Sequence, residues 1–220
     1  MAKTILNQFQ IKVLADFKKT NLIKKFYLSG GTALSEFYLH HRLSEDLDFF
    51  TQEELNIDEL KKFINVVCQK IPVKKIEFQH GFGLYTFFIT TKMGEKHKID
   101  FGQYPFGPIE KLKNFNGLLV EGLFDIAVNK AQTIAFRPRL RDFIDIYFIL
   151  KQRPEWTFQE LLKKSFEKFE MQADSLQVGQ NLLEVEKQID MPIMIKKINM
   201  NKVKEFFFRE AQKLENKIFK

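Results

Sequence analysis

The chain has 220 residues, enough to bury a hydrophobic core as one domain or as two small ones. A composition of 45% hydrophobic and 29% charged residues excludes an intrinsically disordered chain, and no apolar stretch reaches membrane-spanning length, so we expect a soluble cytoplasmic protein. The single cysteine, Cys68, excludes an internal disulfide and a cysteine-rich zinc site, while the net charge of +7 fits either a polyanionic partner or a solvated basic surface.

The first half of the chain predicts alternating helices and strands. Apolar residues at helical spacing indicate amphipathic helices over residues 4–24 and 51–70. An apolar run at 26–28 predicts a strand, and helix-forming residues follow it from 32 to about 41. Alternating apolar residues predict three further strands joined by tight turns, over residues 74–79, 84–91 and 96–101.

The second half of the chain reads as helical after one more short strand. Residues 104–116 contain proline and glycine and read as a loop, and Leu118–Val120 reads as a strand. A helix is expected from Gly122, and the segment Arg137-Pro138-Arg139 breaks it before a second helix over residues 141–150. The segment 156–220 has helical periodicity but no motif with a recognisable chemistry.

The segment from Tyr27 to Phe50, YLSGGTALSEFYLHHRLSEDLDFF, holds the chemistry of the N-terminal half. Gly30 and Gly31 lie at a strand-to-helix turn, where backbone N–H groups can approach an anion closely. Asp46 and Asp48 alternate along a strand, so their carboxylates share one face and suit a hard cation such as Mg²⁺. A phosphate cradle next to metal carboxylates indicates an enzyme that handles nucleoside triphosphates, although a plain turn and a solvent-facing strand edge remain the alternatives.

Further charged residues appear later in the chain. Asp100 shares a strand face with Lys98, and it would join the first two carboxylates if the two strands are neighbours. Lys130 lies near the apolar side of its predicted helix, where it either serves the site or extends its ammonium to solvent. Asp142 and Asp145 share a helix face. They either serve the site, or they act as charges at the helix N-terminus or as ion-pair partners of the neighbouring Arg139 and Arg141.

The adjacent histidines His40 and His41 diverge on a helix, so we interpret them as surface or loop residues and not as a zinc pair.

Together these motifs resemble the AbiEii/AbiGii toxin family of nucleotidyltransferases, within the DNA polymerase β-like superfamily. The typical family string is a GGTAL turn followed by an R-x-S-x-DLDF strand, and here it reads Gly30–Leu34 and then Arg42–Phe49. A helical Lys and an R/K-D-x-x-D motif follow in the family, matched by Lys130 and Arg141–Asp145. The resemblance extends from about Tyr27 to Leu150.

The resemblance implies an α+β fold with a small mixed β-sheet core, flanking helices and a helical C-terminal region. We expect a nucleotidyltransferase core over residues 1–120, and a helical region over 121–220 that completes the nucleotide site. The implied enzyme uses an NTP and Mg²⁺ (or Mn²⁺) to transfer a nucleotidyl group to RNA, with the acceptor end of tRNA as the expected target. Such proteins act as toxins of toxin–antitoxin or abortive-infection systems, so a cognate antitoxin is the expected partner.

The resemblance also implies roles for individual residues. Asp46, Asp48 and Asp100 would hold the metal ions, and Asp100 is also the candidate to accept the proton of the attacking hydroxyl. Lys130 would neutralise triphosphate charge, and either Asp142 or Asp145 would orient it or contact the nucleotide, with Asp142 favoured. The remaining predicted nucleotide contacts are Ser29, Gly30, Gly31, Thr32, Arg42, Ser44 and Lys98.

Two other functions remain open from the sequence. One is nucleotidyl transfer to a small molecule or to a protein hydroxyl. The other is a catalytically silent module that binds NTP or a partner, which would be expected to lack a metal carboxylate, whereas all three are present here.

Overall fold

The structure, a computed structural model, describes residues 4–218. Its contacts divide the chain into two compact units. The N-terminal unit contains the chain up to Tyr38 and the segment Leu43–Gly122, whereas the C-terminal unit contains Leu39–Arg42 and the chain from Leu123 onward. The short segment Leu39–Arg42 therefore belongs with helices that follow it by about a hundred residues.

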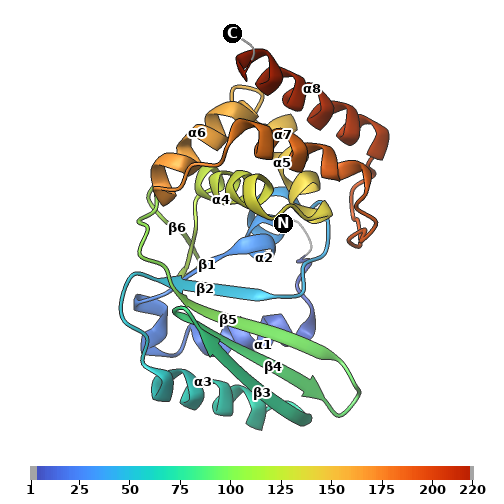
Figure 1. Cartoon of the computed structure of the whole chain (residues 1–220). Helices are drawn as coiled ribbons and strands as arrows, with labels where there is room; N and C mark the ends of the chain where they lie inside the picture. Colours follow the sequence, from blue (N-terminus) through green and yellow to red (C-terminus); the bar gives the residue numbers. More distant parts are fainter. Residues whose placement is uncertain (1–3, 219–220) are drawn as a thin grey trace. The chain divides into compact units, whose positions relative to one another are not determined.

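The described part of the N-terminal unit is built on a seven-stranded mixed sheet with the order β3-β4-β5-β2-β1-β7-β6 (Figure 1). Its strands are β1 (Tyr27–Ser29), β2 (Leu47–Thr51), β3 (Val73–Gly81), β4 (Leu84–Thr91), β5 (Lys96–Gln103), β6 (Lys113–Phe115) and β7 (Leu118–Val120). Strand β2 pairs with β5 in parallel and with β1 in antiparallel orientation. The mixed α+β fold is as predicted, except that the expected loop over residues 104–116 contains strand β6.

One face of the sheet carries an aromatic core covered by helices α1 (Gln8–Phe17) and α3 (Ile57–Gln69) (Figure 1). Phe49 of β2 stacks on Phe17 of α1 at 4.3 Å between ring centroids, and Phe101 of β5 meets Phe63 of α3 edge-on. None of these four rings is more than 3% exposed. Because side chains alternate along a strand, Asp48 and Phe50 of β2 and Asp100 of β5 point to the opposite face.

The helices of the N-terminal unit are shorter than the periodicity alone predicts. Asn7 caps α1 in a capping box, and a separate 3₁₀ turn, Asn21–Lys24, follows it. The helix expected over residues 51–70 begins only at Ile57, because β2 continues to Thr51 and Asn56 caps the first turn. The glycine turn opens α2 (Gly30–Leu34), which continues as a π-helical turn over Ser35–Leu39.

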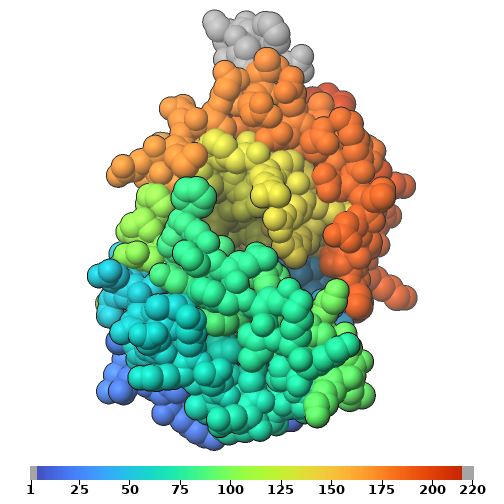
Figure 2. Space-filling view, turned by 60° about the horizontal axis from the view of Figure 1, so that its bottom comes forward, coloured from blue at the N-terminus to red at the C-terminus, as the bar shows by residue number. Residues whose placement is uncertain are grey.

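Figure 2 shows the outer surface of the N-terminal unit, where α3 and the β3–β4 hairpin, in cyan to green, come to the front. Strand β3 forms one edge of the sheet and most of its side chains are exposed.

The described part of the C-terminal unit is helical. Its elements are α4 (Leu123–Phe136), α5 (Leu140–Gln152), α6 (Phe158–Phe169), α7 (Ser175–Leu183), a 3₁₀ turn (Glu184–Glu186) and α8 (Met200–Ile218). The break at Pro138 separates α4 from α5 as predicted. The last two residues of the predicted helical segment lie outside the described residues. Within residues 4–218, no helix is both long and apolar enough to cross a membrane.

Candidate functional site

Two of the predicted metal carboxylates lie side by side on neighbouring parallel strands. Asp48 of β2 is in register with Asp100 of β5, so the two side chains emerge from the same sheet face. Asp46 lies just before β2 and is half-buried. Asp100 is nearly buried, and Thr86 of β4 donates a hydrogen bond of 2.7 Å to its Oδ1. The hairpin strands therefore bring the third carboxylate to the first two.

A positive charge already lies among these carboxylates. The Nζ of Lys98 is 2.5 Å from Asp100 Oδ2 and 3.8 Å from Asp46 Oδ2. Burial by itself would lower the pKa of Lys98, but its hydrogen bond to Asp100 and the nearby carboxylates raise it above the usual value. The ammonium thus remains charged and holds together groups that would otherwise repel each other.

The donor set fits a divalent cation. Carboxylate oxygens are the ligands that Mg²⁺ prefers, and its shell is completed by water and by phosphate oxygens of a substrate. Among residues 4–218, no three histidine, cysteine, aspartate or glutamate side chains converge in the geometry of a finished metal site. The Lys98 ammonium in contact with Asp100 and Asp46 nevertheless shows that this sheet face attracts a cation.

The glycine turn contacts this carboxylate row directly. Gly30 has a φ of +72°, and a Cβ at this position would lie 2.1 Å from Asp48 Oδ2. Only glycine allows both the backbone conformation and the close approach of the carboxylate. The predicted phosphate cradle and Asp48, one of the predicted metal carboxylates, are thus in contact in space as well as close in sequence.

Two hydroxyls that were expected to contact phosphate have protein partners. Ser29 donates a short hydrogen bond to Oε2 of Glu121, which is fully buried, and Thr32 donates one to the backbone oxygen of Asp46. Both side chains therefore fix the turn, and the direct phosphate contacts predicted for Ser29, Gly31 and Thr32 stay predictions. Glu121 was not singled out from the sequence, because nothing near it in the chain indicates a buried carboxylate.

The loop that leads into β2 is held by a helix far from it in sequence. Gln10 of α1 donates its amide Nε2 to the backbone oxygens of Ser44 (2.8 Å) and Glu45 (3.1 Å). Ser44 itself is half-buried. Its predicted contact with the nucleotide is not tested by this geometry.

In the C-terminal unit, the predicted acidic residues of α5 form a buried charged cluster. Asp145, fully buried, accepts hydrogen bonds from Arg42 through Nε (2.7 Å) and Nη2 (2.8 Å), and from Nε2 of His41 (2.8 Å). Lys130 of α4 reaches both Asp145 Oδ2 at 2.8 Å and Asp142 Oδ1 at 2.6 Å. The cluster of His41, Arg42, Lys130, Asp142 and Asp145 thus pairs two permanent cations with two carboxylates.

The cluster answers several questions that the sequence left open. The ammonium of Lys130 does not extend to solvent. It contacts both Asp142 and Asp145, not only one of them. Asp145 forms its ion pairs with Arg42 and Lys130, and not with the neighbouring arginines Arg139 and Arg141. Asp142 keeps one oxygen, Oδ2, without a hydrogen-bond partner among the described residues, whereas both oxygens of Asp145 are engaged. Direct contacts of these residues with a nucleotide remain predictions.

His41 lies in a loop, as predicted, but the alternative of a surface position is wrong for it. Its side chain is completely buried, because the short segment Leu39–Arg42 is clamped into the C-terminal unit. The backbone oxygen of His41 accepts hydrogen bonds from the N–H groups of Ile195 and Lys196, and Arg42 forms a β-bridge with Met194.

Electrostatics explains why this buried cluster stays ionised. Burial alone would raise the pKa of Asp145, but Lys130 and Arg42 hold it well below its usual range. Burial would likewise lower the pKa of Lys130, but Asp142 and Asp145 raise it above its usual value. For His41, burial dominates over the attraction of Asp145 and lowers the pKa, so the imidazole is neutral at pH 7.

This depressed pKa predicts a pH-dependent stability. Below the ordinary histidine pKa of 6.5, His41 is protonated in the unfolded chain but stays neutral in the folded protein. The free energy of unfolding therefore falls as the pH drops. Between pH 7 and pH 5 we expect His41→Gln to weaken this slope by up to about 1.4 kcal/mol per pH unit. Urea unfolding at several pH values measures the slope, and His80→Gln on exposed strand β3 is the matched control. Equal slopes in wild type and His41→Gln would contradict the assignment.

The comparisons with known proteins agree with this geometry. The sequence profile of the family described as "Nucleotidyl transferase AbiEii toxin, Type IV TA system" matches residues 12–216. The chain belongs to this family. An uncharacterised protein of Aquifex aeolicus (strain VF5) is 29% identical over 160 residues, which cover 72% of this chain and 73% of that protein.

A solved structure shares the fold of this AbiEii-family chain. The crystal structure of JHP933 from Helicobacter pylori superposes with a TM-score of 0.60 at 17% identity, covering 96% of this chain and 90% of that one. The predicted family and fold class are confirmed, and the chain is a nucleotidyltransferase of a toxin family. Family membership also implies an NTP substrate and an antitoxin partner.

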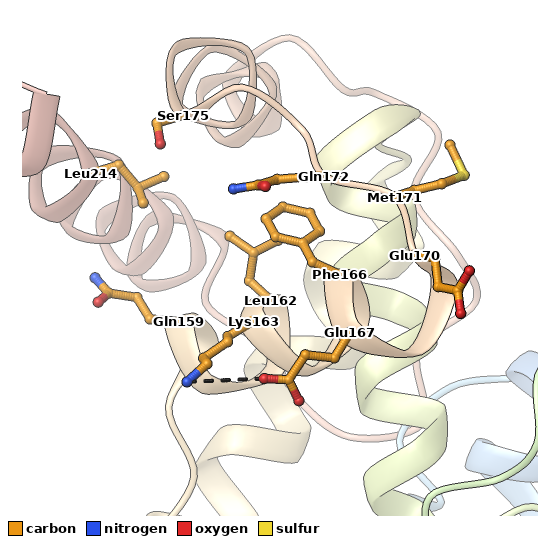
Figure 3. Close-up of a pocket in the computed structure, with 10 residues that line it drawn as sticks. All are labelled: Gln159, Leu162, Lys163, Phe166, Glu167, Glu170, Met171, Gln172, Ser175 and Leu214. Carbon is orange, nitrogen blue, oxygen red and sulfur yellow. Dashed lines mark ion pairs between the residues drawn. The ribbon is translucent and has the colours of Figure 1, made fainter.

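A groove in the C-terminal unit is unrelated to the residues that the AbiEii motifs identify. It has a volume of about 570 Å³ and lies between α6, the segment that follows α6, α7 and Leu214 of α8 (Figure 3). Phe166 and Leu162 point into it, and Lys163 and Glu167 form an ion pair of 4.0 Å at its side (Figure 3). Because none of the carboxylates of the sheet and none of the residues of the buried charged cluster line it, we do not assign the reaction to it.

Proposed function

We propose that this enzyme transfers a nucleoside monophosphate from an NTP to an RNA acceptor, the 3′ end of a tRNA, in a reaction that depends on Mg²⁺ or Mn²⁺. The observation that carries the proposal is the register of Asp48 with Asp100 on adjacent strands, with Gly30 in contact with Asp48 and a cation, Lys98, beside Asp100. A nucleotidyl transfer needs such a row of carboxylates next to a turn that can receive phosphate.

In the proposed reaction, the acceptor hydroxyl oxygen forms a bond to the α-phosphorus of the NTP. The bond between the α-phosphorus and the bridging oxygen breaks, and pyrophosphate leaves with the electron pair. Asp100 takes the proton of the attacking hydroxyl, and Asp46 and Asp48 would hold the divalent cation together with Asp100. When bound, that cation supplies positive charge to the triphosphate and lowers the pKa of the hydroxyl.

Three features of the chain prepare its own residues for these roles. Thr86 orients the carboxylate of Asp100 through a hydrogen bond to Oδ1 and leaves Oδ2 to Lys98. Thr32 holds the backbone at Asp46, and Gly30 lets the carboxylate of Asp48 lie against the turn. The Lys98 ammonium has to move away from the carboxylates, or share them, when a metal ion binds.

Incubation of the protein with each labelled NTP, Mg²⁺ and total RNA tests the proposal. We expect label on tRNA that disappears in the Asp46→Ala/Asp48→Ala variant and on addition of EDTA. Label on protein or on a small molecule would indicate that the acceptor is a protein hydroxyl or a small molecule and not RNA. An absence of label on any acceptor, with every NTP, would overturn the proposed reaction.

A further inference from the structure

The sheet face that carries the carboxylates continues into an aromatic surface. Two residues beyond Asp48 and Asp100, the next pair on this face is Phe50 with Gly102. At a rise of about 3.3 Å per residue, this pair lies roughly 7 Å further along the strands. Phe50 is half-buried, in contrast to Phe49, which is fully buried in the core on the other face.

The glycine opposite Phe50 allows the ring to lie on the strand. A Cβ at Gly102 would meet Cδ1 and Cε1 of Phe50 at 2.6 Å, so any other residue would push the ring away. The ring therefore lies against the backbone of β5 at Gly102, two residues beyond Asp100.

Two further rings extend this surface past the end of β5. Tyr104 meets Phe50 at 5.1 Å between centroids, and Phe106 meets Tyr104 edge-on at 5.6 Å. The backbone N–H of Tyr104 donates to the oxygen of Thr51 at 2.7 Å, which fixes this segment to β2. All three rings are half-buried. We call Phe50, Tyr104 and Phe106 the aromatic platform.

The glycine turn lies beside Asp48 and toward the start of β2, whereas the platform lies toward the end of β2. Strand β1 runs antiparallel to β2, with Ser29 opposite Asp48 and Tyr27 opposite Phe50. Gly30 lies against Asp48, and Thr32 donates to the backbone oxygen of Asp46, so the turn borders the row itself, whereas the aromatic platform begins two residues beyond Asp48. If the triphosphate lies on the glycine turn, an acceptor held at the platform approaches the α-phosphorus from a different side, as in-line displacement requires of the entering and leaving groups.

We propose that the aromatic platform stacks the unpaired terminal nucleobase of the acceptor strand and so places its terminal hydroxyl at Asp100. This assignment rests on the proposed function and specifies its acceptor as the single-stranded end of a polynucleotide. Aromatic rings bind bases of any sequence through their π-faces, and single-stranded ends expose those faces. The platform residues carry no formal charge, so the base contact adds to any attraction between the phosphate backbone and the basic chain.

An equilibrium binding cycle tests the platform without catalysis. Fluorescence anisotropy is measured with a short single-stranded RNA and with the same RNA carrying an abasic 3′-terminal residue. For wild type we expect the abasic RNA to bind about tenfold more weakly, the equivalent of about 1.4 kcal/mol for the loss of one stacked base. Phe50→Leu and Tyr104→Leu should bind the intact RNA about tenfold more weakly and should not distinguish the two RNAs.

The controls separate stacking from unfolding. Tyr104→Phe keeps the ring and should bind as wild type does, and Phe78→Leu removes a half-buried ring from the opposite face and should still distinguish the two RNAs. Thermal unfolding by circular dichroism verifies that each variant is folded. Wild-type binding that ignores the terminal base, or variants that still sense it, would overturn the platform.

Two further measurements keep this inference apart from the proposed function. The affinity for NTP, measured by isothermal titration calorimetry, should be the same in Tyr104→Leu and wild type. A tenfold loss of NTP affinity would assign the platform to the incoming nucleotide and overturn the acceptor proposal. Base-dependent RNA binding by a wild type that transfers no nucleotide would refute the reaction alone, whereas transfer without base-dependent binding would refute the platform alone.

Discussion

Gly30→Ala is expected to reduce nucleotidyl transfer by about 100-fold, because a displacement of a reacting group by about 1 Å costs this much. The new Cβ would lie 2.1 Å from Asp48 Oδ2 and 2.9 Å from its Cγ, so the carboxylate has to leave its place in the row. The positive φ of +72° adds a backbone strain of about 1 to 2 kcal/mol to the folded state. Initial rates of label transfer at saturating NTP and RNA measure the effect.

A second glycine of the same unit gives the matched control. Gly94 has a φ of +86°, but a Cβ there would meet no atom within 4 Å. Gly94→Ala therefore carries the same kind of strain without touching a carboxylate, and it should lose stability but keep its transfer rate. Equal activities of the two variants, with both proteins folded, would show that contact between Gly30 and Asp48 does not position the site.

The carboxylate row was predictable because it depends on local rules. The two-residue alternation of strands predicts Asp46 with Asp48, and Lys98 with Asp100, on shared faces. Lys98 lies 3.8 Å from Asp46 as well as beside Asp100, although β2 itself begins only at Leu47. The sequence left open whether the two strands are neighbours, since pairing between segments fifty residues apart is set by the whole sheet. The parallel register of Asp48 with Asp100 settles this point.

The residues that fix the site could not be predicted in the same way. Glu121 under the glycine turn and Gln10 behind the loop before β2 act across 92 and 34 residues of sequence. Neither lies in a motif, and only the packed sheet brings them into place. The burial of His41 in its loop was unpredictable for a related reason, because its contact with Asp145 spans 104 residues of sequence.

Helix boundaries differed from the prediction where a strand and a helix compete for the same residues. Thr51 was placed at the start of a predicted helix, but it is the last residue of β2, where it pairs with Gln103 of β5. Helix α3 begins only after Asn56, whose side chain accepts hydrogen bonds from the N–H groups of Asp58 and Glu59 and so caps its first turn. Periodicity indicates which elements exist, whereas capping and pairing determine where they begin.

Asp145→Asn is expected to destabilise the C-terminal unit by about 3 to 5 kcal/mol, because removing one member of a buried ionic cluster leaves the remaining charges uncompensated. The carboxylate serves three partners, Arg42, His41 and Lys130, all on the inside of the protein. An asparagine can accept from only one or two of these donors and carries no charge to balance them. Urea unfolding at pH 7, where the wild-type carboxylate is fully ionised, measures the loss.

The double variant Lys130→Met/Asp145→Asn shows whether charge is the cause. Removing the cation together with the carboxylate should recover part of the stability. The sum of the stability losses in the two single variants should therefore exceed the loss in the double variant. Asp190→Asn, at an exposed position of the same unit, should stay within about 0.5 kcal/mol of wild type. Strictly additive losses would indicate that Asp145 acts by packing and hydrogen bonding to Arg42 and His41 alone, because a charge imbalance has to couple the ammonium to the carboxylate.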